Sequence, residues 1–363
     1  MTDAASVNFL QLCPNDHPPF LDICEVHAAA AEQVGLSART VFLGPARAQP
    51  MAKAVYLDQA DMRSTRRLGG ALAAALGDVA EHPLDLALCH RYRALEAFRR
   101  SGLSAQRTVC VAHEFGFFRR ARRRLRRALM YRRVQFAGIS APVVAELETV
   151  VGNALLLPNG IDLARQARDR LSAAQAQQAL DLQAEDFNVA VVGRLHPKKQ
   201  PQLALAGFCA FAVGRPGATL TFLGDGELRR DLQDAAADQR VNFAGFVAHA
   251  ARYLSAFDAV LIPSGEQEAF NMVALEAMAA GVPVVAGPAP GPRYVLGDVG
   301  IYFSAAAPAA VAGALEVAYA RAPASEASAE RGRARAEAEF SLAAASKRLR
   351  SYLDSGPLAA PSS

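Results

Sequence analysis

The sequence predicts an α/β protein built from two doubly wound parallel sheets, and three observations support this fold class. Strand-like and helix-like segments alternate along the chain, which is typical of a parallel sheet with helices on both faces. The chain has 363 residues, enough for two domains of ordinary size. A polar segment rich in Gln and Ala, Ala164–Asp186, separates two alternating series.

The first series begins with a buried strand and ends close to residue 158. Short apolar runs indicate its strands, and amphipathic segments between them indicate its helices. Strands are expected at Asn8–Cys13, Ala38–Leu43, Lys53–Leu57, Leu84–Cys89, Thr108–His113, Val134–Ile139 and Leu155–Pro158. Helices are expected at Asp22–Val34, Met62–Leu76, Phe117–Arg133 and Pro142–Val151.

The second series repeats the same alternation. Asn271 is an expected N-cap and Gly281 an expected helix stop. Strands are expected at Phe187–Val192, Thr219–Leu223, Val241–Phe246, Ala259–Ile262 and Val282–Ala286. Helices are expected at Gln202–Val213, Glu227–Asp238, Tyr253–Phe257, Met272–Ala280, Ala309–Arg321 and Ala327–Leu353.

Composition favours a globular cytoplasmic protein. The chain is 52% hydrophobic and 20% charged, and no apolar run approaches the ~20 residues that a bilayer-spanning helix needs. The N-terminus lacks the basic and apolar regions of a signal peptide. The five cysteines are scattered and form no CxxC, which indicates reduced core thiols.

The positive charge is concentrated in one segment. Nine arginines fall within Arg119–Arg133, and without them the first 163 residues would carry a net charge of −4 instead of +5. Apolar residues recur in this segment at steps of three and four, so it can lie on an anionic membrane surface. Recognition of an anionic acceptor, nucleic acid binding and a solvated helix packed on its own domain are the alternatives. The arginines expected to make such contact are Arg119, Arg122, Arg123, Arg126 and Arg127.

Two carboxylates eight positions apart carry the strongest chemical signal. Glu268 and Glu276 lie on either side of the start of a predicted helix that follows a buried strand. Free backbone N–H groups and the helix dipole make such a helix start an anion site. A carboxylate on each side suggests a ligand with a phosphate in the middle and hydroxyls at both ends, as in a sugar nucleotide.

Other strand ends supply charges and glycines. Arg194 and Lys199 follow the first strand of the second series, where Arg can clamp a diphosphate and Lys adds a point charge. The segments Leu223–Glu227 and Phe243–Val247 end the next two strands, and their glycines allow close backbone approach.

Together these segments resemble the donor-binding domain of the retaining glycosyltransferases of family 4, which have the two-domain GT-B fold. The resemblance runs from about Val189 to Phe303, and its most specific element is the E-x7-E pattern formed by Glu268 and Glu276. The order of GRL with a following Lys, then GDGE, FAGFV and E-x7-E matches the family layout.

The resemblance implies two Rossmann-like domains that face each other across a cleft, with a C-terminal helix crossing back to the first. The expected acceptor-binding domain is residues 1–165, and the expected donor-binding domain is residues 166–336. Residues 337–355 would form the returning helix, and residues 356–363 a disordered tail.

The resemblance also implies a role for each matching residue. Arg194 and Lys199 would bind the donor diphosphate and stabilise the leaving group without a metal or any other cofactor. Glu268 would bind sugar hydroxyls, and Glu276 the ribose. The remaining donor-binding residues would be Gly193, Gly224, Gly226, Phe246, Val247, Phe270, Asn271 and Met272. Glu266 lacks the required spacing and is expected to be a decoy.

The N-terminal half departs further from the family pattern. His113 follows a strand where relatives often carry a cleft histidine, so it is expected to contact the donor sugar or the acceptor hydroxyl. Relatives often have two glycines after the first strand, but this chain has Pro14–Pro19 there. Asp16 and His17 in that loop are candidate acceptor contacts.

We therefore expect a retaining hexosyl- or glycosyltransferase of class EC 2.4. It would move a sugar from a nucleotide-sugar to a hydroxyl of a glycan or glycolipid, such as a lipopolysaccharide core, on the cytoplasmic side with peripheral contact to the inner face of the membrane. A catalytically silent GT-B partner protein, a binder of anionic surfaces or nucleic acid, and a nucleotide-sugar isomerase are the rival interpretations. Neither the sugar, the base, the acceptor nor the oligomeric state follows from the sequence.

Overall fold

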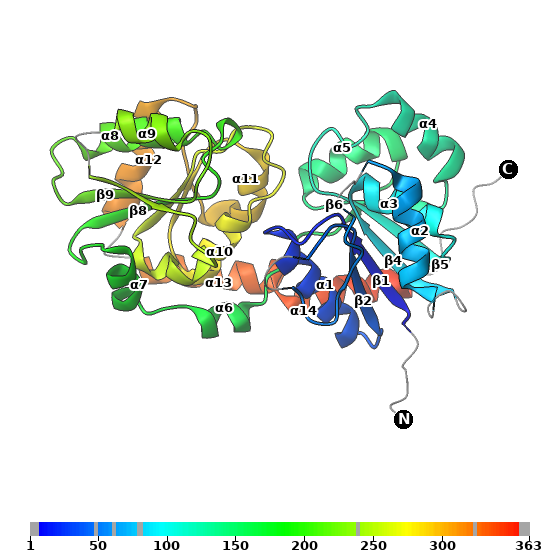
Figure 1. The fold of residues 1–363 in the computed structure, drawn as a ribbon. Helices are drawn as coiled ribbons and strands as arrows, with labels where there is room; N and C mark the ends of the chain where they lie inside the picture. The colour runs from blue at the N-terminus through cyan, green and yellow to red at the C-terminus, as the bar shows by residue number, and fades with distance from the viewer. Residues whose placement is uncertain are drawn as a thin grey trace. The chain divides into compact units, whose positions relative to one another are not determined.

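The computed structural model describes residues 7–46, 50–59, 63–77, 83–236, 240–321 and 325–355. Its chain divides into two compact units, Met1–Ile161 with Phe340–Ser363 and Asp162–Glu339. Each unit is built around a parallel sheet with its own helices (Figure 1). These two Rossmann-like sheets confirm the predicted α/β fold class. The expected disordered tail lies outside the described residues, as do Met62 and Asp238 at two predicted helix ends.

The first unit is built on a seven-stranded sheet in the order β3-β2-β1-β4-β5-β6-β7. The order reverses between β1 and β4, which is the kind of switch point where open α/β sheets bind ligands. The strands are β1 Phe9–Cys13, β2 Ala38–Phe42, β3 Val55–Tyr56, β4 Leu84–His90, β5 Ala105–Ala112, β6 Val134–Gly138 and β7 Leu155–Leu156. The helices are α1 Phe20–Gln33, α2 Thr65–Ala75, α3 Arg91–Ser101, α4 Ala121–Met130, α5 Ala141–Val151 and α14 Leu342–Asp354.

The second unit has a six-stranded sheet in the order β10-β9-β8-β11-β12-β13, with its own switch point between β8 and β11. The strands are β8 Phe187–Val192, β9 Ala218–Leu223, β10 Val241–Gly245, β11 Ala259–Ile262, β12 Val284–Ala286 and β13 Ile301–Tyr302. The helices are α6 Leu163–Asp169, α7 Ala173–Leu180, α8 Pro201–Ala212, α9 Arg229–Ala235, α10 Met272–Ala280, α11 Pro290–Leu296, α12 Pro308–Arg321 and α13 Ser325–Phe340. Short 3₁₀ turns lie at Pro197–Lys199, Ala250–Ala256 and Gly297–Val299.

Two predicted helices differ from the structure. The basic helix expected at Phe117–Arg133 is shorter, because Phe117 and Phe118 are buried in an aromatic cluster with Phe136 and α4 begins only at Ala121. The helix expected at Ala327–Leu353 is divided into α13 and α14 at Ser341. The Ser341 hydroxyl accepts a hydrogen bond from the N–H of Ala344, so it caps the start of α14.

Four helices, α3, α6, α7 and α11, were not predicted from the sequence. Helix α3 follows β4 directly, and its basic, polar sequence hides an inner face that includes Leu95 and Phe98. The polar segment between the two series forms α6 and α7, each capped by a side chain at its start. Helix α11 begins in a Pro-Gly-Pro sequence that is typical of a turn. No helix in the described ranges is long and apolar enough to cross a membrane.

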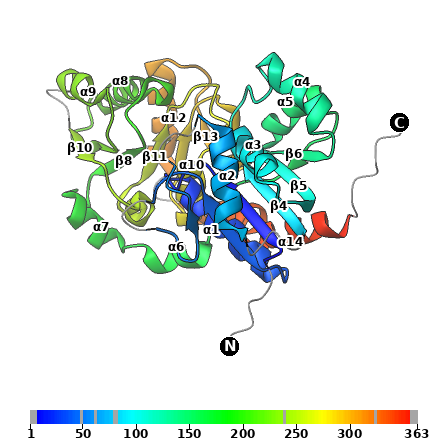
Figure 2. The same cartoon turned by 45° about the vertical axis from the view of Figure 1, so that its right-hand side comes forward.

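The C-terminal helix belongs to the first unit. Helix α14 packs on α1 (Figure 2), where Ala345 joins Val26 and Ala30 in a small apolar cluster. The hydroxyl of Ser346 donates to the side-chain oxygen of Gln33 at 2.7 Å. The chain thus returns to the N-terminal domain, as the GT-B fold class implies.

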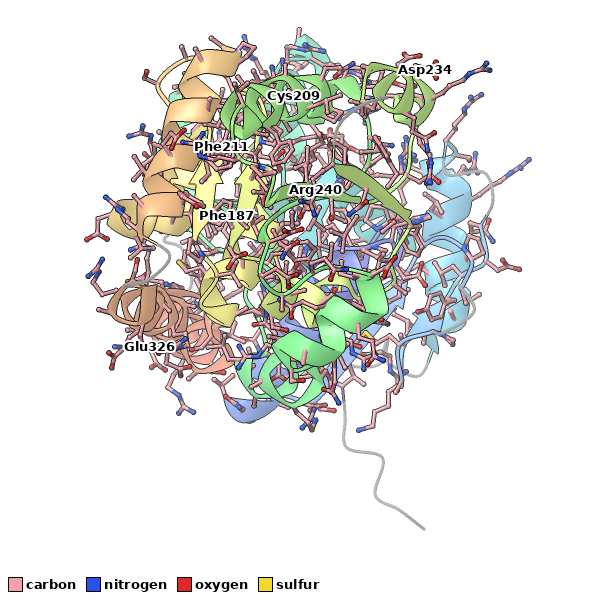
Figure 3. The ribbon with its side chains drawn as sticks, turned by 90° about the vertical axis from the view of Figure 1, so that its left-hand side faces the viewer. Phe187, Cys209, Phe211, Asp234, Arg240 and Glu326 are labelled. Atoms are coloured by element: carbon pink, nitrogen blue, oxygen red, sulfur yellow. The ribbon has the colours of Figure 1, made fainter. Side chains whose placement is uncertain are left out.

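The second unit has an aromatic layer between its sheet and two covering helices. Phe187 of β8 and Phe211 of α8 lie close together (Figure 3), with ring centroids 5.8 Å apart. Tyr319 of α12 contacts both rings edge-on. Gly207 lets α8 and α12 approach closely, because a Cβ there would clash with Val311. This packing fixes the sheet whose strand ends carry the candidate donor site.

Acid is expected to destabilise the first unit, because His27 is buried as the neutral imidazole and neither ring nitrogen has a hydrogen-bond partner. Burial lowers the pKa of His27 from 6.5 to about 4. Below pH 6.5 the unfolded chain therefore binds a proton that the folded chain does not, so stability present above pH 6.5 is lost as the pH falls towards 4. The full loss from this group is about 3 kcal/mol.

Urea denaturation of the protein at pH 7.5, 6.0 and 4.5 measures this loss. His27→Leu should weaken the pH dependence, whereas His249→Gln, at an exposed histidine of the second unit, should leave it unchanged. An unaltered dependence in His27→Leu would contradict the account.

Candidate functional site

The start of helix α10 has the N-cap that the sequence predicts. The side chain of Asn271 accepts a hydrogen bond from the N–H of Ala274 at 2.8 Å, which confirms Asn271 as the N-cap. Gly281 ends the helix in the left-handed conformation, with φ of 79°. The first N–H groups of an α-helix have no backbone partner within the helix, and with Ala274 bound to the cap, those of Met272 and Val273 are the ones that a ligand could meet.

Helix α11 supports the loop before α10. The N–H of Gly291 donates to the carbonyl oxygen of Glu268 at 2.9 Å. A Cβ at position 291 would come within about 2.6 Å of the backbone of Glu268, Ala269 and Phe270, so only glycine fits there. The ring of Phe270 is buried and lies 6.2 Å from that of Tyr294. Helix α11 thereby fixes the backbone that carries Glu268.

Lys199 and Glu268 form an ion pair, with Lys199 Nζ 2.6 Å from Glu268 Oε2. The Lys199 side chain is 41% exposed and the Glu268 side chain 16% exposed, so both remain partly accessible to a ligand. Lys199 stands at the end of the 3₁₀ turn after β8, and Glu268 stands in the loop after β11. The structure thus brings together Lys199, which the sequence assigned to the donor diphosphate, and Glu268, which it assigned to the donor sugar.

The glycines after β8 and β9 allow two loops to pack against each other. The N–H of Gly193 donates to the carbonyl oxygen of Leu223 at 3.0 Å, and that of Leu195 donates to Asp225 at 2.9 Å. A Cβ on Gly224 would clash with the carbonyl of Gly193, and one on Gly226 with the backbone of Leu195. Gly224 and Gly226 are therefore required by the protein itself, whether or not a ligand approaches them.

The other donor-site candidates lie at the same sheet edge or on α10. Arg194 is exposed in the loop after β8, and Glu276 is half-buried on α10 one turn after its start. Phe246 and Val247 follow β10, and the Phe246 side chain is 73% exposed. Glu266 is exposed in the loop before α10.

Arg229 is a residue of this edge that sequence reasoning missed. Its guanidinium donates to the carbonyl oxygen of Phe243 at 3.2 Å and pairs with Asp225 at 3.3 Å. Arg229 therefore ties the end of β10 to the loop after β9. Only its spacing of four from Asp225 could have indicated it.

In the first unit, His113 follows β5 and lies beside a second histidine. His90 Nδ1 and His113 Nε2 are 2.9 Å apart, and the Phe20 ring meets His113 edge-on with centroids 5.0 Å apart.

Asp16 is buried and His17 is exposed in the loop after β1. Asp16 neighbours Tyr56, whose pKa is raised by burial first and by the Asp16 carboxylate as well.

The arginines of α4 and of the turn before it divide into two groups. Arg119, which precedes α4, and Arg122 are exposed. Arg123 lies over the Tyr92 ring and donates to the carbonyl oxygen of Phe117 at 2.7 Å, and Arg127 donates to Val151 at 3.2 Å. These inward arginines anchor the helix to its own unit.

A buried carboxylate holds the remaining inward arginine. Arg126 pairs with Glu96 at 2.9 Å, and the Tyr131 hydroxyl also donates to Glu96. Burial alone would raise the pKa of Glu96, but the hydrogen bonds from Tyr131 and Arg126 outweigh it and leave the pKa lowered. The outward face of α4 carries Leu125 and Leu129, which are 60% and 65% exposed.

With this geometry in place, the chain can be compared with known proteins. Residues 186–321 match the family model described as "Glycosyl transferases group 1". A D-inositol 3-phosphate glycosyltransferase of Segniliparus rotundus is 33% identical over 141 residues, which are 36% of this chain and 31% of that protein. The lipopolysaccharide core biosynthesis glycosyltransferase LpsE of Rhizobium meliloti is 40% identical over 92 residues, 24% of this chain and 27% of LpsE. The chain thus matches about a third or less of the length of these relatives.

Solved structures extend the likeness of fold to nearly the whole chain. HepE of Anabaena, solved with UDP and glucose, has a TM-score of 0.76 at 20% identity. The match covers 96% of this chain and 100% of the HepE chain. The lipopolysaccharide glycosyltransferase WaaG has a TM-score of 0.70 at 16% identity, with 96% and 100% covered. At these identities the likeness establishes the fold. The fold is the GT-B fold, and the segment that matches the glycosyl transferases group 1 model lies in the second unit.

Gly224→Ala should destabilise the second unit by about 2–4 kcal/mol, because its Cβ would push apart the two loops after β8 and β9. Gly313→Ala is the matched control, since Gly313 lies on the exposed face of α12 with open space around it. That change should be neutral or stabilise by up to about 1 kcal/mol. Urea denaturation measures both, and equal stabilities of the two variants would refute the loop-packing role of Gly224.

Proposed function

We propose that the chain is a glycosyltransferase that moves a sugar from a nucleotide-sugar to a hydroxyl group of a glycan or glycolipid. The Lys199–Glu268 ion pair beside the start of α10 carries this proposal. It joins a cation suited to a phosphate with a carboxylate suited to sugar hydroxyls, next to free helix N–H groups. The pair lies inside the segment that matches the glycosyl transferases group 1 model.

Each part of a nucleotide-sugar has a counterpart at this edge. Lys199 and Arg194 bind the diphosphate, with the N–H groups of Asn271 and Met272 on its other side. Glu268 binds sugar hydroxyls, and Glu276 binds those of the ribose. The base lies near Phe246 and Val247, while Gly193, Gly224, Gly226 and Phe270 shape the floor of the site.

Lys199 has three N–H donors, so it can keep one bond to Glu268 while two others meet the diphosphate. The cations and the α10 dipole stabilise the negative charge that develops on the departing nucleotide. The leaving group is thus stabilised by Lys199, Arg194 and the start of α10. We propose that no metal or other cofactor is required.

We further propose that the reaction retains the anomeric configuration by a same-face displacement. The bond from the anomeric carbon to the departing phosphate oxygen breaks as the bond to the acceptor oxygen forms. The acceptor's proton passes to the departing phosphate. Glu268 is paired with Lys199 and is assigned to sugar hydroxyls, so it is not a free nucleophile or general acid. The two-carboxylate mechanism of glycoside hydrolases therefore fits this site poorly.

We propose an acceptor at an anionic membrane surface, such as a lipopolysaccharide core on the inner leaflet. The observation that favours it is the outward face of α4, where Leu125 and Leu129 are exposed between the exposed arginines Arg122 and Arg124. Exposed leucines can enter the headgroup region while flanking arginines meet anionic lipids. The name of LpsE agrees with this acceptor class. The protein would then act in the cytoplasm with peripheral contact to the membrane.

A catalytically silent partner protein and a nucleotide-sugar isomerase remain rivals, and a donor panel separates them. A thermal-shift screen against UDP-, GDP-, ADP- and CMP-sugars identifies the donor. Sugar transfer to an acceptor glycan then supports the transferase. Nucleotide-sugar interconversion without transfer would support the isomerase, and binding without turnover the silent protein.

Glu268→Ala should reduce transfer by at least about 100-fold, because it removes the sugar contact and the partner that positions Lys199. Glu266→Ala is the matched control, since Glu266 is exposed two positions earlier in the same loop. Steady-state kinetics and circular dichroism on both variants measure activity and folding. Wild-type activity in Glu268→Ala would overturn the assignment of the site.

Leu125→Ser with Leu129→Ser should weaken binding to vesicles containing phosphatidylglycerol by at least about 10-fold, because each leucine loses about 2 kcal/mol of apolar burial. Val213→Ser is the control, since Val213 is 75% exposed in the second unit. Arg122→Gln should weaken binding in a salt-dependent manner. Vesicle co-sedimentation measures all three, and unchanged binding of the double-serine variant would contradict the membrane surface.

A further inference from the structure

A chain of polar side chains crosses the core of the first unit and ends at His113. The side-chain nitrogen of Gln11 on β1 donates to the carbonyl oxygen of Cys24 at 2.7 Å and to the hydroxyl of Thr40 at 2.6 Å. The side-chain oxygen of Gln11 lies 3.4 Å from His90 Nε2. His90 Nδ1 lies 2.9 Å from His113 Nε2.

The direction of every hydrogen bond in this chain follows from its first link. A backbone carbonyl can only accept, so the Cys24 carbonyl fixes which end of the Gln11 amide is the nitrogen. The Gln11 oxygen then faces His90 and can only accept, so His90 Nε2 carries the proton. In a neutral imidazole the other nitrogen is an acceptor, and His90 Nδ1 therefore accepts from the Nε2–H of His113.

The surroundings keep these rings neutral. Gln11 and His90 are fully buried. Burial lowers the pKa of His90, and the neighbouring His113, His27 and Arg91 lower it further. Burial likewise lowers the pKa of His113, with Arg91 and His27 adding to the effect. His27 stacks on His90 from α1, with ring centroids 5.4 Å apart, and the Arg91 guanidinium lies 4.7 Å from the Phe20 ring centroid.

We propose that Gln11 and His90 are positioning residues that leave His113 with Nδ1 as a hydrogen-bond acceptor for a sugar hydroxyl. The Nε2 edge of His113 is occupied by His90, so only the Nδ1 edge is available to a ligand. This proposal rests on the proposed glycosyltransferase function for the identity of the ligand. The hydrogen-bond chain itself depends only on the geometry of the first unit.

The assignment has a chemical consequence. A lone pair at Nδ1 attracts the O–H of a sugar and repels a phosphate oxygen, which is also an acceptor. His113 therefore discriminates for a hydroxyl group at one position of a sugar. It carries no acidic proton on its ligand-facing edge, so it does not protonate the leaving group.

Nitrogen-15 NMR of the histidine rings in the wild-type protein at pH 7.5 tests the hydrogen-bond chain without any substrate. We expect both His90 and His113 as neutral Nε2–H tautomers, with a coupling across the hydrogen bond between His113 Nε2 and His90 Nδ1. An Nδ1–H tautomer or an imidazolium at His113 would overturn the proposal. Gln11→Met should weaken or abolish this coupling. Thr40→Val is the matched control and should preserve it, because the Cys24 carbonyl still fixes the Gln11 amide.

Kinetics with deoxy sugars test the role of the chain in sugar recognition. Removing the hydroxyl that meets His113, from either the donor sugar or the acceptor, should lower kcat/KM by about 3- to 10-fold in the wild type. The same removal should have no effect in His113→Ala, and Gln11→Met should lie between the two. Inhibition by the free nucleoside diphosphate should be unchanged in all variants, because His113 does not meet the phosphates.

The outcomes separate this proposal from the proposed function. Transfer with equal sensitivity to every deoxy sugar in the wild type and in His113→Ala would overturn the role of His113 and leave the transferase standing. Absence of transfer from every donor would overturn the proposed function, and the NMR result would still decide the state of the His90–His113 pair.

Discussion

The packing of the two loops after β8 and β9 sets the position of Lys199, and the candidate donor site depends on that position. Gly224 and Gly226 have no side chains, so the backbone after β9 lies directly against Gly193 and Leu195. The chain then turns through Pro197–Lys199 and places the Lys199 amine 2.6 Å from Glu268. Because the Lys199–Glu268 ion pair is partly exposed, it contributes little to the stability of the fold. Its significance is that it fixes where the Lys199 charge lies.

The position of Glu268, the partner of Lys199, is fixed as well. Gly291 braces the backbone of Glu268, and Asn271 caps the helix that follows. Lys199 and Glu268 therefore meet because two independently braced loops lie at adjacent strand ends of one sheet, where β8 pairs with β11. In the proposed function, this preorganisation lets a site of few residues bind a flexible diphosphate, because the side chains that bind it are already ordered when the protein folds.

Much of this architecture could be predicted from the sequence, because apolar strand runs and the E-x7-E spacing are local patterns. The Lys199–Glu268 pair joins residues 69 positions apart, and it depends on loop packing that no local pattern encodes. The inward orientation of Arg126 was likewise not predicted, because its carboxylate partner Glu96 lies on α3, a helix whose polar sequence gave no sign of its buried face. The His90–His113 pair was missed because it depends on the pairing of β4 with β5, which no local pattern encodes.

Calorimetric titration of UDP, GDP and ADP into the protein, in the presence of a chelator such as EDTA, decides whether Lys199 belongs to a diphosphate site that needs no metal. We expect saturable binding of one nucleoside diphosphate at a single site without added metal. The affinity should fall as the salt concentration rises and should fall sharply in Lys199→Ala. Absence of binding without a divalent cation, or equal affinity in Lys199→Ala, would show that Lys199 does not form such a site.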